Sequence, residues 1–599
     1  MRQMRPPWLP LAVAGLGLTL SMGAWASVAT ADPPPPVAGA LTSGDSLLPN
    51  QGNGGYDVRH YDIDLVYSPV TVAQPSGSIQ ATTTITAWAD QPLSSFSFDF
   101  KGLEVESVTV DQVPAGHSRI EDPGQDLHKL VVTPAQPVSG QFTVAVSYFG
   151  QPEEYVLQVG FTMAEGWMAN RDYTAWVNGQ SVTYPADGGA TGIGQPNGNM
   201  TWFPANLTPA DKATFTTSLT VPDQYSAVGL GQLREKTPAQ PGTTRWVWEE
   251  SVATSAFLAV ASIGQFTEHD GQVTVNGQTI PISAYGDPNL EALSPGGAEG
   301  VLELLEEILD WGTDQFGAYP ASVAGYILAP VRAGWALEIF GKPFFARPIQ
   351  DIVLVHEYVH MWAGDSVSVQ DWRDLWLAEG FATYAEWLWQ ESQGGVSALA
   401  QAESIWTANL DESPLWVASV ARPAVEQLWG IGSYTGGGLA FAALRAGLGD
   451  DVFGQLVRQW FATYAGANAS TEDFIDLAQA VSGRDLSQWA QDWLYEPGRP
   501  AAWPDLTTYP PLPVVPAEPD PDPDPGSGSG SLPGGGAGVG SSGSNLPDTG
   551  AKLGLAGLAL SASLVLAGLA LMESGRRLRL VPVPSRAAPI RPRGPRHGL

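Results

Sequence analysis

The chain has 599 residues, of which 44% are hydrophobic and 15% charged, a composition typical of a globular protein long enough for more than one domain. Its formal net charge is −33, from 61 acidic and 28 basic side chains, so the sequence predicts no nucleic-acid partner. There is no cysteine, which excludes disulfides, thiolate metal ligands and cysteine nucleophiles and leaves any metal site to His, Asp and Glu.

The first 31 residues have the organisation of a secretory signal peptide. Arg2 and Arg5 precede an apolar run over residues 8–22, and small residues follow it. Cleavage sites of the A-x-A type end at Ala26 and Ala31. The apolar run is shorter than the roughly 20 residues that span a bilayer, so we expect export with removal of this segment.

The body of the chain changes its periodicity part-way along. Residues 56–264 contain short segments of alternating apolar and polar side chains, separated by Pro, Gly and Asp, which predict a β-rich domain. From about residue 288, apolar residues recur at intervals of three and four, which predicts helices. Ser470 or Thr471, followed by two acidic residues, is a typical helix start. The predicted helices cover 301–316, 349–361, 375–393, 436–448, 471–481 and 486–494. A β-rich half followed by a mostly helical half gives an α+β, multidomain fold class.

A metal site is predicted within the helical half. His356 and His360 are four residues apart, so on a helix both imidazoles face the same side, with Glu357 beside them toward a bound water. After eighteen intervening residues, Glu379 lies in the sequence Trp-Leu-Ala-Glu-Gly-Phe-Ala at the start of another predicted helix and supplies a third ligand. Three such ligands with one open position are typical of one catalytic Zn²⁺ ion. The alternative is that both histidines are core residues and Glu357 forms a salt bridge.

Glu386 follows Glu379 by seven residues and therefore lies on the same helix face. It could orient a ligand histidine through a hydrogen bond, or be an exposed or salt-bridged carboxylate.

The end of the chain carries a tether and a sorting pattern. Residues 504–545 are rich in Pro, Asp, Gly and Ser and predict a linker. Leu-Pro-Asp-Thr-Gly at 546–550 is followed by an apolar transmembrane segment over 551–572 and a basic cytoplasmic tail over 573–599. A plain C-terminal membrane anchor is the alternative.

This arrangement resembles the LPxTG sorting signal of Gram-positive surface proteins. The resemblance implies that a sortase cuts between Thr549 and Gly550 and joins the chain to cell-wall peptidoglycan, after the span has held it in the membrane. It places the protein at the cell wall or cell surface of a Gram-positive-type bacterium.

The zinc motifs, together with residues 202–204 and 211–215, resemble the aminopeptidase N family of gluzincin metallopeptidases over most of 52–500. The resemblance implies an N-terminal β saddle domain over 52–270 and a thermolysin-like zinc peptidase domain over 271–503. It also implies a zinc aminopeptidase that removes N-terminal residues from extracellular peptides. Two alternatives stay open: an endopeptidase with an open cleft, and a wall-displayed adhesin that has lost catalysis.

The same resemblance assigns roles around the metal. Tyr434 takes the place of the tyrosine that stabilises the oxyanion. Gly334, Ala336 and Glu338 match the G-x-M-E-N-like strand whose glutamate binds the substrate amine, and Gln195 matches a second amine contact.

The chain departs from the family pattern at several positions. Met361 stands for the usual Gln, Ala378 for the usual Asn, and Ile339 ends the G-x-M-E-N-like motif. Seventeen residues separate Glu338 from His356, which is short for the family. Longer members have a large helical C-terminal domain, and we expect no counterpart here because the linker begins near residue 504. We therefore expect a more open cleft than in those members.

Overall fold

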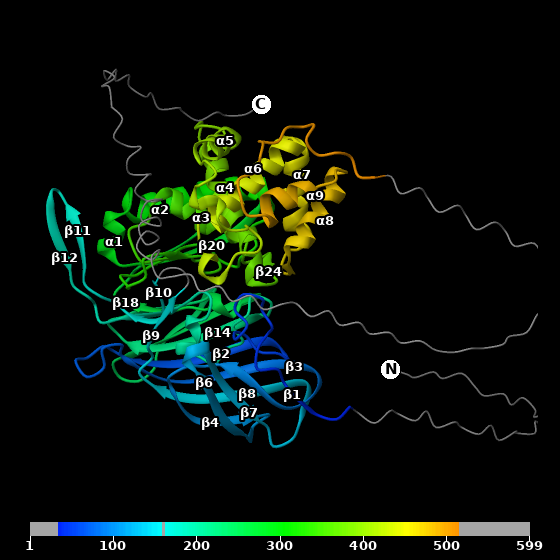
Figure 1. Cartoon of the computed structure of the whole chain (residues 1–599). Helices are drawn as coiled ribbons and strands as arrows, with labels where there is room; N and C mark the ends of the chain where they lie inside the picture. Colours follow the sequence, from blue (N-terminus) through cyan, green and yellow to red (C-terminus); the bar gives the residue numbers. More distant parts are fainter. Residues whose placement is uncertain (1–33, 159–161, 514–599) are drawn as a thin grey trace, which may run out of the picture.

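The computed structural model describes residues 34–158 and 162–513, and its largest sheet forms the lower half of the molecule in Figure 1. Most neighbouring strands in this eleven-stranded sheet are antiparallel. Its main path follows the order β16 (Gln232–Pro238), β17 (Thr243–Ser255), β14 (Lys212–Pro222), β2 (Asp57–Ser68), β3 (Ser78–Asp99), β8 (Val138–Gly150), β4 (Glu104–Val110) and β5 (Val113–Pro114). The attached strands are β1 (Val37–Ala38), β6 (Gly116–Asp122) and β7 (Leu127–Thr133).

Strand β2 shows why these segments form a sheet with one covered face. Ile63 and Leu65 are completely buried, whereas Asp62 is exposed and Asp64 is half-buried. Successive side chains of a strand point to opposite faces, so the alternating sequence buries one face and leaves the other in water. The β-rich first half predicted from this pattern is confirmed.

A second, smaller sheet lies between the large sheet and the helices. Its strand order is β15 (Ser226–Gly229), β18 (Ala261–Gly264), β13 (Ala190–Ile193), β10 (Thr162–Ala169) and β9 (Glu154–Gln158). Between β10 and β13 the chain forms a separate hairpin of β11 (Tyr173–Val177) and β12 (Gln180–Tyr184), which projects from the body in Figure 1.

The second half opens with strands. A five-stranded sheet has the order β19 (Thr267–Val275), β20 (Gln278–Gly286), β21 (Ile327–Leu328), β23 (Phe344–Phe345) and β22 (Ala336–Leu337). The predicted division between residues 270 and 271 falls inside β19. A short parallel pair, β24 (Ser368–Val369) and β25 (Asn468–Ala469), lies among the helices.

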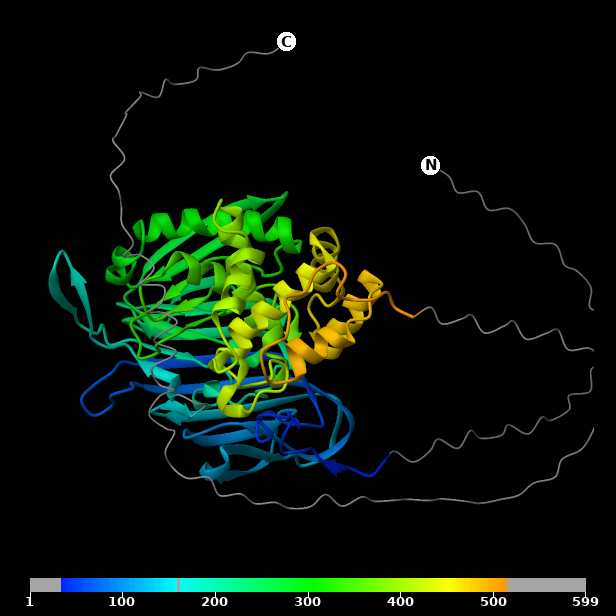
Figure 2. The same cartoon turned by 45° about the horizontal axis from the view of Figure 1, so that its top comes forward.

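Helices make up most of the remaining second half, as predicted. They are α1 (Pro288–Leu293), α2 (Gly297–Phe316), α3 (Asp351–Val359), α4 (Trp376–Ser392), α5 (Ala398–Ala408), α6 (Gly437–Leu448), α7 (Asp450–Thr463), α8 (Thr471–Ser482) and α9 (Ser487–Ala490). In the turned view of Figure 2 the yellow and orange helices lie together beside the green strands, with the blue sheet below. The α+β fold class is therefore confirmed.

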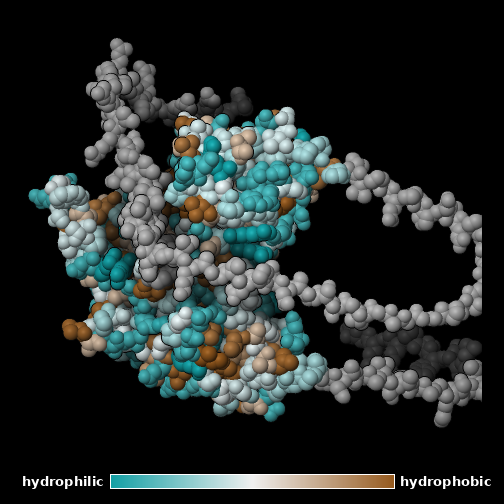
Figure 3. Space-filling view, viewed as in Figure 1, coloured by the Kyte–Doolittle hydropathy of each residue, from teal (hydrophilic) through white to brown (hydrophobic). Residues whose placement is uncertain are grey.

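The core of the helical half is strongly aromatic. Trp376 at the start of α4 is completely buried and contacts the rings of Phe441, Phe474 and Trp489. These rings come from different helices, so one tryptophan holds α4 against three other segments. On the face seen in Figure 3, apolar residues are scattered over both halves between hydrophilic ones.

Several predicted segments lie outside the described residues. They are the signal peptide, most of the linker, the sorting motif with Thr549 and Gly550, the C-terminal apolar span and the basic tail. Within the described ranges, every helix is too short or too polar to cross a membrane.

Candidate metal centre

The two histidines of the predicted metal site meet at the end of α3. His356 lies in the last turn of the helix, and His360 directly follows its final residue with helical dihedral angles. The ring centroids are 4.9 Å apart. The helix ends earlier than predicted, at Val359, yet the four-residue spacing still places both rings on one side.

Glu379 completes the group from the first turn of α4. Its Oε2 lies 3.2 Å from His356 Nε2 and 3.3 Å from His360 Nε2. A tetrahedral zinc ion with bonds of about 2.1 Å requires ligand atoms about 3.4 Å apart, so the spacing fits this ion. The two imidazoles and one carboxylate are also a donor set that zinc accepts with one position left open.

The outer nitrogen of each histidine has a hydrogen-bond partner. His356 Nδ1 is 2.8 Å from Glu386 Oε1, and His360 Nδ1 is 2.9 Å from the carbonyl oxygen of Ala363. Such partners fix the tautomer that leaves Nε2 free to bind a metal. The structure thus brings Glu386 to the position that its spacing predicted.

Opposing effects set the charges of Glu379 and His360. Burial raises the pKa of Glu379, but the two histidines outweigh this effect and hold the pKa well below its usual range. Burial lowers the pKa of His360, and Glu379 reverses this effect and raises it to about 9. The carboxylate is therefore ionised at neutral pH and available as a ligand.

Glu357 lies on α3 beside the ligands and is almost completely buried. Burial raises the pKa of its carboxyl to about 8, while His356 and His360 act in the opposite direction. A carboxyl whose pKa lies near neutrality is suited to accept and return a proton.

Tyr434 lies in a π-helical turn, Gly432–Gly436, that precedes α6. Its ring stacks on His356 with centroids 6.1 Å apart and planes at 13°. Burial, together with Glu379, raises the pKa of Tyr434 well above its usual value, so its hydroxyl stays protonated and can donate a hydrogen bond.

The two residues predicted to bind an amine contact each other across the two halves of the chain. Gln195 Nε2 donates to Glu338 Oε1 at 2.6 Å, and both side chains are buried. Gln195 belongs to a loop of the first half, with a cis peptide bond to Pro196. Glu338 follows β22, where Ala336 pairs with Phe345 of β23.

Strand β22 is the last in its sheet, so its other edge is unpaired within that sheet. Gly334 lies just before this strand and Ala336 within it. A free strand edge offers backbone groups to an extended peptide.

Two family models match this chain. The "Peptidase M1 N-terminal domain" matches residues 58–258, and the "Peptidase family M1 domain" matches residues 347–493. The chain belongs to peptidase family M1. The second match includes all three metal-ligand candidates.

Curated M1 relatives are longer than the matched region. "Aminopeptidase N" of Streptomyces lividans is 26% identical over 323 residues, covering 50% of this chain and 37% of the relative. Human "Glutamyl aminopeptidase" is 23% identical over 404 residues, covering 61% of this chain and 42% of the relative. The chain thus spans about two-fifths of the length of these relatives.

A solved M1 structure has a matching extent. The M1 zinc metallopeptidase of Deinococcus radiodurans, crystallised as a mutant bound to a Tyr-Ser-Ala substrate, is 28% identical, with a TM-score of 0.66. The similarity covers 78% of this chain and 100% of that chain. The same protein without the mutation gives a TM-score of 0.65 over 79% of this chain.

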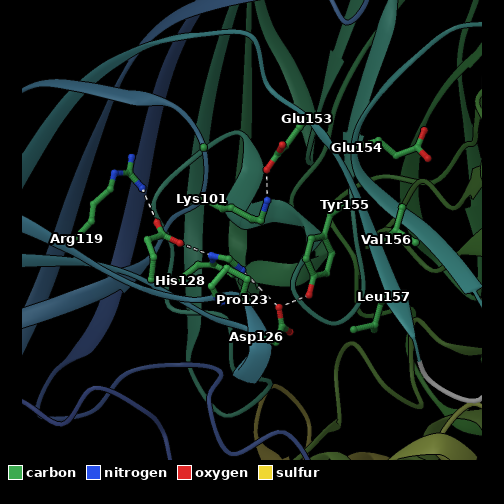
Figure 4. A pocket seen from close by; sticks show the side chains of 12 residues that line it. Lys101, Arg119, Pro123, Asp126, His128, Glu153, Glu154, Tyr155, Val156 and Leu157 are labelled. Atoms are coloured by element: carbon green, nitrogen blue, oxygen red, sulfur yellow. Dashed lines mark hydrogen bonds and ion pairs between the residues drawn. The ribbon is translucent and has the colours of Figure 1, made fainter.

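A separate hollow of about 680 Å³ in the first half contains none of the predicted site residues. Figure 4 shows that its charged groups contact one another: Lys101 pairs with Glu153, and Tyr155 donates to Asp126. Because these polar groups are already paired, the hollow gives no sign of a ligand.

Sequence reasoning missed two ionisable residues near the metal site. Asp365 is 1% exposed, and the half-buried Lys212 donates hydrogen bonds to the backbone carbonyls of Asp365, Ser366 and Ala467. Lys212 lies in the segment that carried the family resemblance, but its spacing to the zinc motif holds no information about this contact.

Proposed function

We propose that this M1 peptidase is a zinc aminopeptidase, and the contact between Gln195 and Glu338 beside the metal ligands is the observation that carries the proposal. The Glu338 carboxylate and the Gln195 carbonyl oxygen are both acceptors and suit the three donors of a substrate ammonium group. His360 and Glu379 lie close enough to Glu338 to influence its pKa. An amine held there would place the first peptide bond near the metal.

The metal ligands in this proposal are His356, His360 and Glu379. When bound, one zinc ion supplies Lewis-acid chemistry, which polarises the scissile carbonyl and lowers the pKa of a water molecule. Glu357 accepts the proton of the attacking water and passes it to the leaving amine. Tyr434 donates a hydrogen bond to the carbonyl oxygen as negative charge develops there.

Substrate positioning is assigned to the edge strand and the residue that follows it. The backbone of Gly334 and Ala336 would pair with an extended peptide along the free edge of β22. Glu338 and Gln195 would hold the free N-terminus, so cleavage falls after the first residue. Peptides of extracellular origin are the expected substrates.

The deciding experiment compares free amino-acid amides with their N-acetylated forms, with and without a chelator. We expect chelator-sensitive hydrolysis of the free-amine substrates alone, restored by added zinc. Cleavage of blocked peptides would indicate an endopeptidase instead. Zinc binding without turnover of any substrate would indicate a wall-displayed adhesin that has lost catalysis.

We further propose that the protein acts at the surface of a Gram-positive-type cell, on the basis of its terminal sequences. A sortase would cut between Thr549 and Gly550, and peptidoglycan would be the attached partner. Deleting residues 546–550 should shift the protein from the cell-wall fraction to the membrane and the medium. An unchanged wall fraction would contradict this proposal.

A further inference from the structure

Lys212 joins the first half of the chain to the metal-ligand turn of the second half. It begins β14 in the large sheet, and its side chain is half-buried. Its ammonium group donates to three backbone carbonyl oxygens: those of Ser366 at 2.8 Å, Asp365 at 3.0 Å and Ala467 at 3.1 Å. All three donors of the ammonium group are thus used on backbone of the second half.

Two of these carbonyls belong to the turn, residues 360–368, that follows α3, the helix with His356 and Glu357. Asp365 N donates to the carbonyl oxygen of His360 at 3.0 Å, and Ser366 N donates to that of Met361 at 3.1 Å. Ala363, in the same turn, accepts the hydrogen bond of His360 Nδ1. Lys212 therefore holds the same turn whose Ala363 carbonyl orients the second histidine.

The turn also packs directly against the His360 ring. Gly364 has a φ of +128°, and a Cβ added there would lie 3.3 Å from His360 Nδ1. With so little space between turn and imidazole, a small shift of the turn must move the ring or lengthen its hydrogen bond.

Electrostatics gives Lys212 a second connection to this turn. The Asp365 carboxyl is buried, and neither of its oxygens has a hydrogen-bond partner among the described residues. The Lys212 ammonium group, which donates to the backbone carbonyl of the same residue, is a positively charged group close to this buried carboxyl.

We infer that Lys212 is a positioning residue for the metal site: it holds the turn 360–368 so that His360 keeps the orientation needed to bind the metal. The first half of the chain thereby contributes to catalysis from a site that touches neither metal nor substrate. This inference deepens the proposed function and rests on it for the catalytic consequence, whereas its effect on metal binding does not depend on the substrate.

The two halves keep another contact in this region when Lys212 is removed. Asn468 Nδ2 donates to the carbonyl oxygens of Pro209, at 2.7 Å, and Val369, at 2.9 Å. A Lys212 variant should therefore fold with the halves still joined, and Asn468→Ala is a matched control that removes a connection without touching residues 360–366.

The first test replaces Lys212 with Met, which keeps an unbranched side chain as far as the Cε position and removes the ammonium group. We expect zinc affinity, measured by chelator competition, to fall about 10-fold or more, the size seen when outer partners of metal ligands are lost. In turnover assays kcat should fall and KM should stay within about a factor of two, because the amine-binding residues are unchanged. Asn468→Ala should lower the unfolding temperature and leave zinc affinity unchanged.

The second test restores the ammonium group chemically. Because the chain contains no cysteine, Lys212→Cys introduces a single thiol. When unfolded protein reacts with 2-bromoethylamine, the thiolate forms a C–S bond, bromide leaves, and the product carries an ammonium group at nearly the lysine position. Iodoacetamide gives a neutral adduct as the control.

After refolding, the aminoethylated protein should regain zinc affinity and the visible spectrum of the Co²⁺-substituted parent, whereas the neutral adduct should not. Equal zinc affinity for both adducts, or a Lys212→Met variant that loses stability alone, would overturn the inference. Metal binding and the Co²⁺ spectrum are measured without substrate, so an absence of aminopeptidase activity in the parent would be recognised separately.

Discussion

At the scale of single residues, the metal site depends on side chains one step removed from the metal. Glu386 and the Ala363 carbonyl hold the outer nitrogens of the two histidines, at 2.8 Å and 2.9 Å. The two partners differ chemically: one is a carboxyl group and the other a neutral backbone carbonyl. A carboxylate partner also makes His356 a stronger metal ligand. The seven-residue spacing to Glu379 predicted the first partner, whereas the carbonyl partner depends on a turn that side-chain patterns do not specify.

Glu386→Gln should weaken zinc binding about 10-fold to 100-fold, because a neutral amide is a poorer acceptor for His356 Nδ1–H. Chelator competition measures the change directly. Glu403→Gln, at an exposed position on α5, is the control and should change nothing. Equal zinc affinities for the two variants would contradict the role given to Glu386.

Glu357→Gln should lower kcat at least about 100-fold and up to about 10,000-fold, because the amide cannot take a proton from the attacking water. Zinc content should stay unchanged, since Glu357 is not among the grouped ligand atoms. Steady-state kinetics and metal analysis of one preparation test both statements, and retained activity would exclude the proposed general base.

Glu165, whose carboxyl faces the backbone of residues 195–198, provides a test of stability against pH. It has no exposed surface, and burial raises its pKa from 4.5 to about 8. Between these two values the folded state binds a proton that the unfolded state releases, so this group makes the protein less stable as pH rises toward 8.

Glu165→Gln should therefore flatten that dependence, with a gain in the free energy of unfolding of about 1–4 kcal/mol at pH 8 relative to the gain at pH 5. Urea unfolding of both proteins at the two pH values measures the difference. A gain of the same size at both pH values would show that Glu165 does not titrate in this range.

Among the helices and strands, those whose own segment shows a periodicity or a capping pattern could be predicted from the sequence. Helix α8 begins as predicted, because the side chain of Ser470 accepts from Asp473 N while Asp473 reaches back to the Ser470 backbone. Strand β22 has two residues, too few to show any period, and owes its conformation to pairing with β23. The strand near the proposed amine site could therefore be predicted only from the family motif.

Ser470→Ala should lower the free energy of unfolding by about 1 kcal/mol, because it removes the cap of α8 and leaves a backbone N–H without its acceptor. The urea midpoint reports this change. Ser404→Ala, an exposed position within α5, should alter stability by less than about 0.5 kcal/mol. If both variants behave alike, the capping contact contributes nothing measurable.

At the scale of the whole molecule, the site is assembled from parts that are far apart in the sequence. Gln195 and Lys212 come from the first half, while His356, Glu379 and Tyr434 come from three segments of the second. The sequence predicted the three metal ligands because the spacing of His356 and His360 and the segment around Glu379 are both recognisable local patterns. It could not predict the Lys212 contacts, because a lysine that binds backbone carbonyls leaves no pattern in its partners' side chains.

Removal of zinc should loosen this assembly, because the metal would connect α3 to α4 through His356, His360 and Glu379. Free zinc at about 1,000 times its dissociation constant stabilises a folded protein by about 4 kcal/mol. For a folded region of this size, that is a shift of about 4 °C in unfolding temperature. Calorimetry before and after chelation, followed by zinc addition, should show the loss and its recovery. In a His360→Ala variant chelation should shift nothing, and an equal loss there would place the stabilising metal elsewhere in the chain.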